Sequence, residues 1–222
     1  MKRARRALLL GIAVALLGAC GGGLRSRAAP LVSYVLHAPA AEAVAAKTTP
    51  AIRKPLDYAV TVLPPAVEPG LADDGVALVT GDSRLDRFAA SRWPDTVPRL
   101  VSALAVRTLR NSGAIATIND AAAPFTADFL LRINVSNFEA HYTGAHADGA
   151  EAPVVQVRFE CAIARRSDRT VIASFIAESS ETASENRMGG VIAAFDRATQ
   201  SALTQLRRQT LQTLAAQAAR TP

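Results

Sequence analysis

The residues best suited to covalent chemistry are two cysteines, Cys20 and Cys161. Cys20 directly follows Gly18 and Ala19, at the end of a short apolar stretch. A thioether can only form from a thiol, and small residues before the thiol let a peptidase reach the bond to be cut. Cys20 thus offers a thiol that could be modified, directly after a peptide bond that could be cut. Cys161 lies among alternating apolar residues, and we expect it to be a buried, inert thiol.

The segment before Cys20 has the organisation of a secretory signal. Four of the first six residues are basic, and residues 7–19 form an apolar run of 13 residues, where a spanning helix needs about 20. The tetrapeptide at residues 17–20, LGAC, resembles the lipobox of bacterial lipoproteins. The resemblance implies cleavage between Ala19 and Cys20 and acyl chains on Cys20. An ordinary signal peptide with a chance cysteine is the alternative.

The residues after Cys20 predict where the protein is held. Gly21 stands where an aspartate would retain a lipoprotein of a Gram-negative bacterium at the inner membrane, so the resemblance implies the periplasmic face of the outer membrane. Residues 21–30 are glycine-rich and basic, and we expect a flexible tether that spans about 17 Å. Two or more acyl chains anchor a protein stably without a spanning helix.

Charge and composition exclude several classes of protein. Half of the residues are hydrophobic, which predicts a folded core and excludes wholesale disorder. The formal net charge is +6, but residues 1–19 hold four basic and no acidic residues, so cleavage would leave +2. No basic run is interleaved with aromatic residues, and we expect no nucleic-acid partner.

The chain shows little sign of catalysis. Of its three histidines, His37, His141 and His146, the last two are five residues apart in a loop rich in glycine and alanine, a poor spacing for zinc. Neither a G-x-S-x-G nucleophile motif nor a phosphate-binding G-x-x-x-x-G-K-[ST] motif occurs. We therefore expect no enzyme activity, no metal and no cofactor other than the covalent lipid on Cys20. ATP hydrolysis would have to come from another subunit.

Hydrophobic periodicity predicts an α+β fold. Residues 38–55, rich in alanine and proline, are expected to form a surface loop. Apolar spacings of three and four predict two helices, at 93–112 and 188–219, the second extending past the core or fraying from Arg207 onward. Strands are predicted at 31–37, 58–67, 75–80, 84–89, 115–118, 127–142, 154–164 and 170–179. The last three strands would form an antiparallel meander, and the two helices would pack on one face of a mostly antiparallel sheet.

The sequence is expected to divide into three parts. Residues 1–19 are the predicted signal peptide. Residues 20–56 carry the lipidated cysteine, the tether, the first strand and the loop rich in proline and alanine. Residues 57–222 hold the main domain, and the whole domain is expected to span about 31–218.

Trp93 is the one tryptophan and lies at the entry to the first predicted helix. It has two interpretations: a packing anchor, or a contact in a partner interface, where tryptophan and arginine dominate the energetics. Arg87 and Arg92 flank Trp93 and would share such an interface.

Several short motifs together resemble the ABC-type transport auxiliary lipoprotein family. The resemblance covers essentially the whole chain after cleavage. One departure is Phe88, where the family often has tyrosine, so a hydroxyl is lost; the 38–55 insert is also longer than expected. The motifs are the lipobox at Cys20, Tyr34-x-Leu36, a strand with Val60, Val62 and Pro64, the triplet Pro69-Gly70-Leu71, and the stretch RLDRFAASRWPD at 84–95.

The resemblance implies a fold like that of the amino-terminal domain of TolB and a role in transport without catalysis. Members accompany an ABC ATPase, a permease and a mammalian cell entry (MCE) substrate-binding protein, in systems that move phospholipids or other hydrophobic molecules between the inner and outer membranes. The lipoprotein would receive the tip of the MCE assembly. Whether it forms a homo-oligomer is left open.

A second hypothesis is that the protein acts on its own and not as a transport subunit. The protein would be a stand-alone outer-membrane lipoprotein that binds lipid or lipopolysaccharide in its own cavity, or that acts in outer-membrane assembly. Neighbouring genes for an ATPase, a permease and an MCE protein would favour the first hypothesis, whereas an enclosed apolar cavity would favour the second. A periplasmic hydrolase is the least supported reading.

Overall fold

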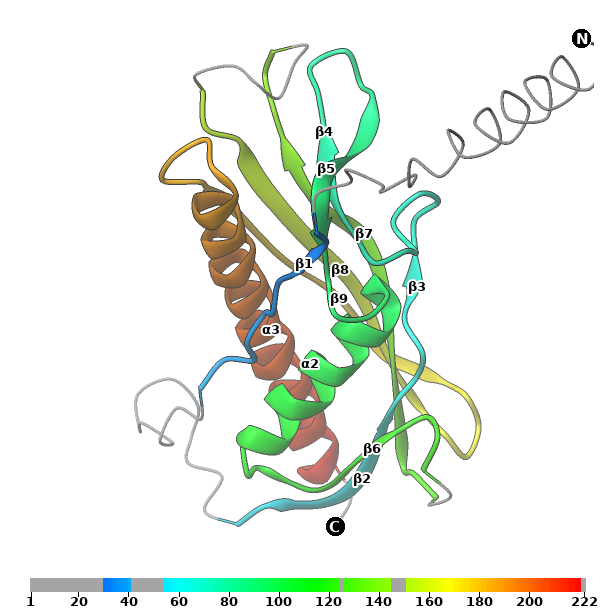
Figure 1. Ribbon diagram of the computed structural model, residues 1–222. Coiled ribbons are helices and arrows are strands. Elements are labelled where there is room, and N and C mark those ends of the chain that lie inside the picture. Colours follow the sequence, from blue (N-terminus) through cyan, green and yellow to red (C-terminus); the bar gives the residue numbers. More distant parts are fainter. Residues whose placement is uncertain (1–29, 41–53, 124–125, 145–150, 221–222) are drawn as a thin grey trace, which may run out of the picture. The chain divides into compact units, whose positions relative to one another are not determined.

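The computed structural model describes residues 30–40, 54–123, 126–144 and 151–220 (Figure 1). Most of the predicted 38–55 loop falls outside these residues. No described helix is both long enough and apolar enough to cross a membrane. The elements are β1 (Val32–Ser33), β2 (Leu56–Val62), β3 (Ala66–Val67), β4 (Gly75–Val79), β5 (Leu85–Arg92), α2 (Val97–Asn111), β6 (Ile115–Asp120), β7 (Phe129–His141), β8 (Val154–Arg165), β9 (Val171–Thr182) and α3 (Met188–Ala218).

The long strands β7, β8 and β9 form the predicted antiparallel meander. Alternation explains β8, in which every second residue from Val155 to Ile163 is buried. In β7 the buried set changes parity after Val135, and Phe138 is the next fully buried residue. The register with β8 shifts at this point, so Ser136 is an extra residue in β7. This bulge returns the side chains of the second half of β7 to the core.

The other edge of β7 is shared by three short strands. β2, β3 and β4 pair with β7 one after another, and all three run parallel to it. The predicted strand at 58–67 is thus two strands, because Pro64 and Pro65 supply no backbone donor at the junction. β2 also pairs with β6 in parallel, while β4 and β5 form the predicted antiparallel hairpin. The fold class is confirmed as α+β with a mixed, mostly antiparallel sheet; the parallel pairings were not predicted.

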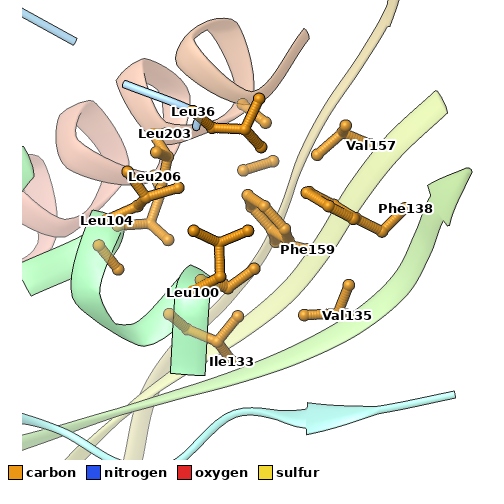
Figure 2. Close-up of a cluster of buried hydrophobic side chains, with 14 of the residues drawn as sticks. Leu36, Leu100, Leu104, Ile133, Val135, Phe138, Val157, Phe159, Leu203 and Leu206 are labelled. Atoms are coloured by element: carbon orange, nitrogen blue, oxygen red, sulfur yellow. The ribbon is translucent and has the colours of Figure 1, made fainter. Parts of the chain in front are cut away.

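Both helices lie on one face of this sheet (Figure 1). α3 packs against β8 and β9, and α2 packs against β6 and β2. Between helices and sheet, Phe138 and Phe159 face Leu203 and Leu206 of α3, and Leu100 of α2 joins them (Figure 2). These residues form the centre of one continuous core.

The end of α3 corrects one expectation. From Arg207 onward the helix was predicted to leave the core or fray, because its sequence is polar and rich in alanine. Instead Arg207 is only 7% exposed, and Thr210 and Leu214 are fully buried. Their spacing of three and four residues keeps them on the buried face, where the long stem of an arginine can pack against apolar neighbours.

Residues 31–222 form one compact unit. Met1–Pro30 separates from it as a second unit, of which only Pro30 is described. The strand predicted at 31–37 is reduced to the two residues of β1, which pair in parallel with Ser91 and Arg92 at the end of β5.

Candidate functional site

The predicted lipidation site falls outside the described residues. Cys20 and Ala19 belong to the undescribed part of the chain, so acylation and cleavage there stay predictions. The described chain starts at Pro30, immediately before β1, and the site begins where the predicted tether meets the domain.

Residues 34–39 fasten this entry point to the domain. The Tyr34 amide donates to the Arg92 carbonyl (2.9 Å), and Leu36 is 2% exposed within the core. The His37 amide donates to Oδ1 of Asp196 in α3 at 2.7 Å, and the His37 ring nitrogen Nδ1 lies 3.3 Å from Oδ2 of the same carboxylate. The backbone of residue 31 therefore emerges at a defined place on the domain surface.

Three large apolar side chains around this entry point are exposed. Leu31 is 63%, Val32 45% and Val35 58% exposed to solvent. We call these three residues the β1 apolar patch. The sequence predicted a strand here, but gave no sign that the strand would leave its apolar residues uncovered.

An open groove of about 720 Å³ lies beside β1. Its lining includes Val32 of β1 and the adjoining Tyr34, Asp86 and Phe88 of β5, and Met188 and Val191 of α3. The Phe88 ring lies 6.3 Å from that of Tyr142, whose hydroxyl donates to Oδ1 of Asn186 at 2.8 Å. Burial raises the pKa of Tyr142. The groove thus combines an aromatic wall with polar and charged groups.

A bulge in β5 shapes this groove. Residues 88–91 of β5 stand opposite the single residue Val76 of β4, because the register shifts between the Gly75–Arg92 and Ala77–Arg87 pairs. Ala90 has a φ of 52°, a left-handed conformation uncommon for residues other than glycine. All four bulged residues line the groove. No motif in the sequence marked this bulge.

Trp93 is placed in the core, which corrects its proposed role at a partner interface. The indole is 0% exposed, and its ring lies 5.8 Å from that of Phe138 and 5.2 Å from that of Phe195. A side chain without exposed surface has none to offer a partner. The alternative interpretation, a packing anchor, fits the structure.

Arg87 is engaged within the domain. Its guanidinium donates to both carboxylate oxygens of Asp73, from Nε at 3.0 Å and Nη2 at 2.9 Å, and also to the Gly70 carbonyl. This hydrogen bonding lowers the pKa of Asp73 below its ordinary value, against the opposing effect of partial burial. Arg87 therefore clamps the 70–75 loop onto β5, and only 27% of its side chain is exposed.

Arg92 is more accessible than the other two predicted interface residues. Its side chain is 48% exposed, and Nη1 lies 3.8 Å from a carboxylate oxygen of Asp74. The structure therefore brings Arg92 and the β1 apolar patch together through the pairing of β1 with β5, while Trp93 turns inward.

Among the residues that the structure describes, the remaining candidates for chemistry either lie against a neighbouring side chain or are buried. His141 lies 3.0 Å from a Glu139 carboxylate oxygen, and His146 is outside the described residues. Among the residues described, no three metal-ligating side chains are grouped. Cys161 is 3% exposed, and burial, with a smaller effect from the charge of Glu160, raises its pKa to about 12. A thiol that holds its proton so firmly is a poor nucleophile, as expected for Cys161.

The fold is similar to those of solved structures, which include the following two. A protein from Xanthomonas campestris assigned to the DUF330 family matches with a TM-score of 0.69 and 22% identity, over 87% of this chain and 100% of that one. An uncharacterised protein matches with a TM-score of 0.55 and 16% identity, over 70% of this chain and 94% of that one. At such identities the likeness shows the fold alone. The predicted likeness to TolB stays a prediction.

Sequence comparison gives the family. No match to a curated protein is found. The family model described as ABC-type transport auxiliary lipoprotein component matches residues 34–210, which run from the segment after β1 to the last third of α3. Since this match covers well over half of the chain, the chain belongs to the family of ABC-type transport auxiliary lipoprotein components.

Proposed function

We propose that this protein is a lipid-anchored, non-catalytic docking subunit of an ABC transport system of the MCE type. The observation that carries the proposal is the family match over residues 34–210. The LGAC tetrapeptide at residues 17–20 adds an anchoring cysteine ahead of the matched domain. Acyl chains on Cys20 would hold the domain at a bilayer through the 21–30 tether.

We further propose partners, a cargo and a membrane location for this protein. The partners would be an MCE-domain protein together with a permease and an ATPase, and the cargo would be phospholipids or other hydrophobic molecules moving between the two membranes. Gly21 after the cysteine supports placement on the inner leaflet of the outer membrane. From there the domain would receive the end of the MCE assembly that crosses the periplasm.

The contacts that the ionisable side chains make within the domain support docking rather than catalysis. Arg87 is bound to Asp73, His37 lies against Asp196, and Cys161 keeps its proton in the core. Arg87 and His37 thus each lie against a carboxylate within the fold, and the Cys161 thiol stays protonated. A catalytic group would instead be expected to lie in a cleft with a pKa suited to proton transfer or nucleophilic attack.

The stand-alone lipid binder gains no comparable support. That hypothesis calls for an enclosed apolar cavity. The groove beside β1 and a second hollow of about 710 Å³ on the sheet are both open, and both mix charged with apolar residues. An acyl chain in either would remain in contact with water.

Affinity purification from membranes tests the proposal. The tagged protein, expressed at native level and extracted in mild detergent, should recover an MCE-domain protein, together with the permease and the ATPase in smaller amounts. An unrelated outer-membrane lipoprotein with the same tag is the matched control. Recovery of none of these subunits, from a preparation in which the bait is confirmed to be membrane-bound, would contradict the proposed role.

A further inference from the structure

The β1 apolar patch is an unusual concentration of exposed hydrophobic side chains. Six large apolar residues are strongly exposed in the described structure, and three of them, Leu31, Val32 and Val35, fall within five positions. Single exposed apolar residues are normal on protein surfaces, whereas a group of them marks a contact with a partner or a membrane.

The patch is held open by the backbone. Val32 pairs with Ser91, the Tyr34 amide donates to the Arg92 carbonyl, and Leu36 is inserted in the core. With Tyr34 and Leu36 fixed on either side of it, the Val35 side chain cannot turn inward without breaking these contacts. The exposure of Val35 is therefore a property of the folded domain.

The position of the patch in the chain identifies its partner. It follows directly on residues 21–30, which lead from the predicted acylated Cys20. Ten residues span about 17 Å as a flexible chain and at most about 36 Å when fully extended. An acylated chain would keep the patch within this distance of the bilayer at all times, so lipid is the apolar phase that the patch meets first.

Charge near the patch points the same way. Residues 21–30 contain Arg25 and Arg27 and no acidic residue. Arg187 lines the groove beside Val32; its side chain is 83% exposed, and its Nε lies 3.7 Å from a carboxylate oxygen of Glu185. Basic groups close to a membrane surface are attracted by anionic headgroups.

We propose that Leu31, Val32 and Val35 form a membrane-contact surface that enters the headgroup region of the bilayer. This inference rests on the proposed lipid anchor and adds to it a defined orientation: the β1 end of the sheet faces the lipid. The three exposed side chains of the patch are aliphatic, so moving them from water into the acyl chains of a bilayer is favourable.

Depth-dependent quenching tests this orientation. An environment-sensitive NBD dye would be attached in the Val35→Cys variant, with Val171→Cys as matched control, since these residues are 58% and 57% exposed and Val171 starts β9. Cys161, 3% exposed, should resist labelling. In vesicles of phosphatidylethanolamine and phosphatidylglycerol that contain nitroxide-labelled lipid, the dye at position 35 should be quenched several-fold more strongly than the dye at 171.

Three outcomes would overturn the inference. Two are equal quenching at both positions and no quenching at position 35 in protein that floats with the vesicles. The third is a change at position 35 that depends on protein concentration and not on lipid, which would assign the patch to a second copy of the chain.

A second arm separates this inference from the anchor itself. If the native protein fails to float with vesicles, the proposed anchor fails. A Cys20→Ser variant, with an amino-terminal hexahistidine tag bound to nickel-chelating lipid in place of the acyl chains, still tests the patch. Strong quenching at position 35 and not at 171 in that arm supports the contact surface, and equal or absent quenching refutes it.

Discussion

Two of the edge strands of the sheet, β9 and β1, are finished in opposite ways. At one end, β9 is a 12-residue strand, and side chains of α3 bind its backbone. Gln205 Nε2 donates to the Glu178 carbonyl at 2.7 Å, and the Glu178 amide donates back to Gln205 Oε1 at 3.3 Å. Nη2 of Arg197 donates to the Thr182 carbonyl at 3.3 Å. At the other end, β1 is two residues long, and the exposed β1 apolar patch consists of Val32 in this strand together with Leu31 and Val35 beside it.

The difference indicates what each end is for. A long unpaired strand edge invites pairing with other chains, and proteins block it with charged groups, short strands or a covering element. The helix that follows β9 supplies that cover. β1 is too short to pair extensively, but its apolar side chains are left in water unless something covers them. We have proposed that the bilayer does so.

The substitution expected to destabilise the β1 end most is at Trp93, which follows β5, the strand that pairs with β1. Trp93→Ala should lower the free energy of unfolding by about 3–5 kcal/mol, because it empties a fully buried site between Phe138 and Phe195. Urea denaturation of the Cys20→Ser form, followed by circular dichroism, measures the loss. Trp93→Phe should lose less, and an unchanged midpoint for Trp93→Ala would contradict its place in the core.

Leu36→Ala should detach the β1 segment while the β9 end remains intact. The loss of this buried leucine should cost roughly 2–5 kcal/mol. Hydrogen exchange should accelerate at Tyr34, whose amide bonds to Arg92, and should change less along β9. The exposed Val171→Ala change is the control and should have almost no effect on stability. Equal acceleration at both ends would show that the two ends are not independent.

Gln205→Ala should expose the β9 edge. Removing both hydrogen bonds to Glu178 should cost about 1 kcal/mol, since the freed backbone groups can bind water instead. The variant should also self-associate more readily, which sedimentation velocity would detect. Gln209→Ala, one turn further along α3, is the control. A Gln205→Ala protein that stays as stable and as monodisperse as the parent would argue against the protective role.

The smallest expected effect is a pH dependence at Asp73, in the 70–75 loop that Arg87 clamps onto β5. Hydrogen bonding from Arg87 lowers the pKa of Asp73 in the folded state, so the ionised carboxylate stabilises the fold at neutral pH. That contribution is lost as the pH falls below about 4, through the folded-state pKa. Because the Asp73 side chain is 57% exposed, the effect should be under about 1 kcal/mol.

Asp73→Asn is the corresponding test. The variant should be less stable than the parent at neutral pH, and the difference should shrink in urea titrations at about pH 3. A difference that grows on acidification would reverse the assigned sign.

Much of the fold could be predicted because its signals are local. The strict alternation of β8 and the three-and-four spacing of α2 are contained in their own segments. The parallel pairing of β2, β3 and β4 along one edge of β7 was missed, because strand partners depend on the whole chain. Arg207 was misjudged for a similar reason: its residue type predicts solvent, while its place on the helix face puts it inside.

The site was less predictable than the fold. Arg92 was selected together with Trp93 because they are adjacent, yet at the end of β5 one side chain is half exposed and the other fully buried. The β5 bulge at residues 88–91 and the left-handed Ala90 carry no glycine signal. The sequence of the β1 apolar patch predicted an ordinary strand. Its exposure could not be predicted, because the surrounding elements determine whether an edge strand is covered.

The central claim is that Cys20 holds this domain at a membrane. Intact-mass spectrometry of protein extracted from membranes of the native host tests it most directly. We expect a chain that begins at Cys20 and carries a diacylglyceryl group on its sulfur and an acyl group on its amino end. A chain with a free thiol at Cys20 would contradict the claim, and with it the membrane orientation of β1 in the native protein.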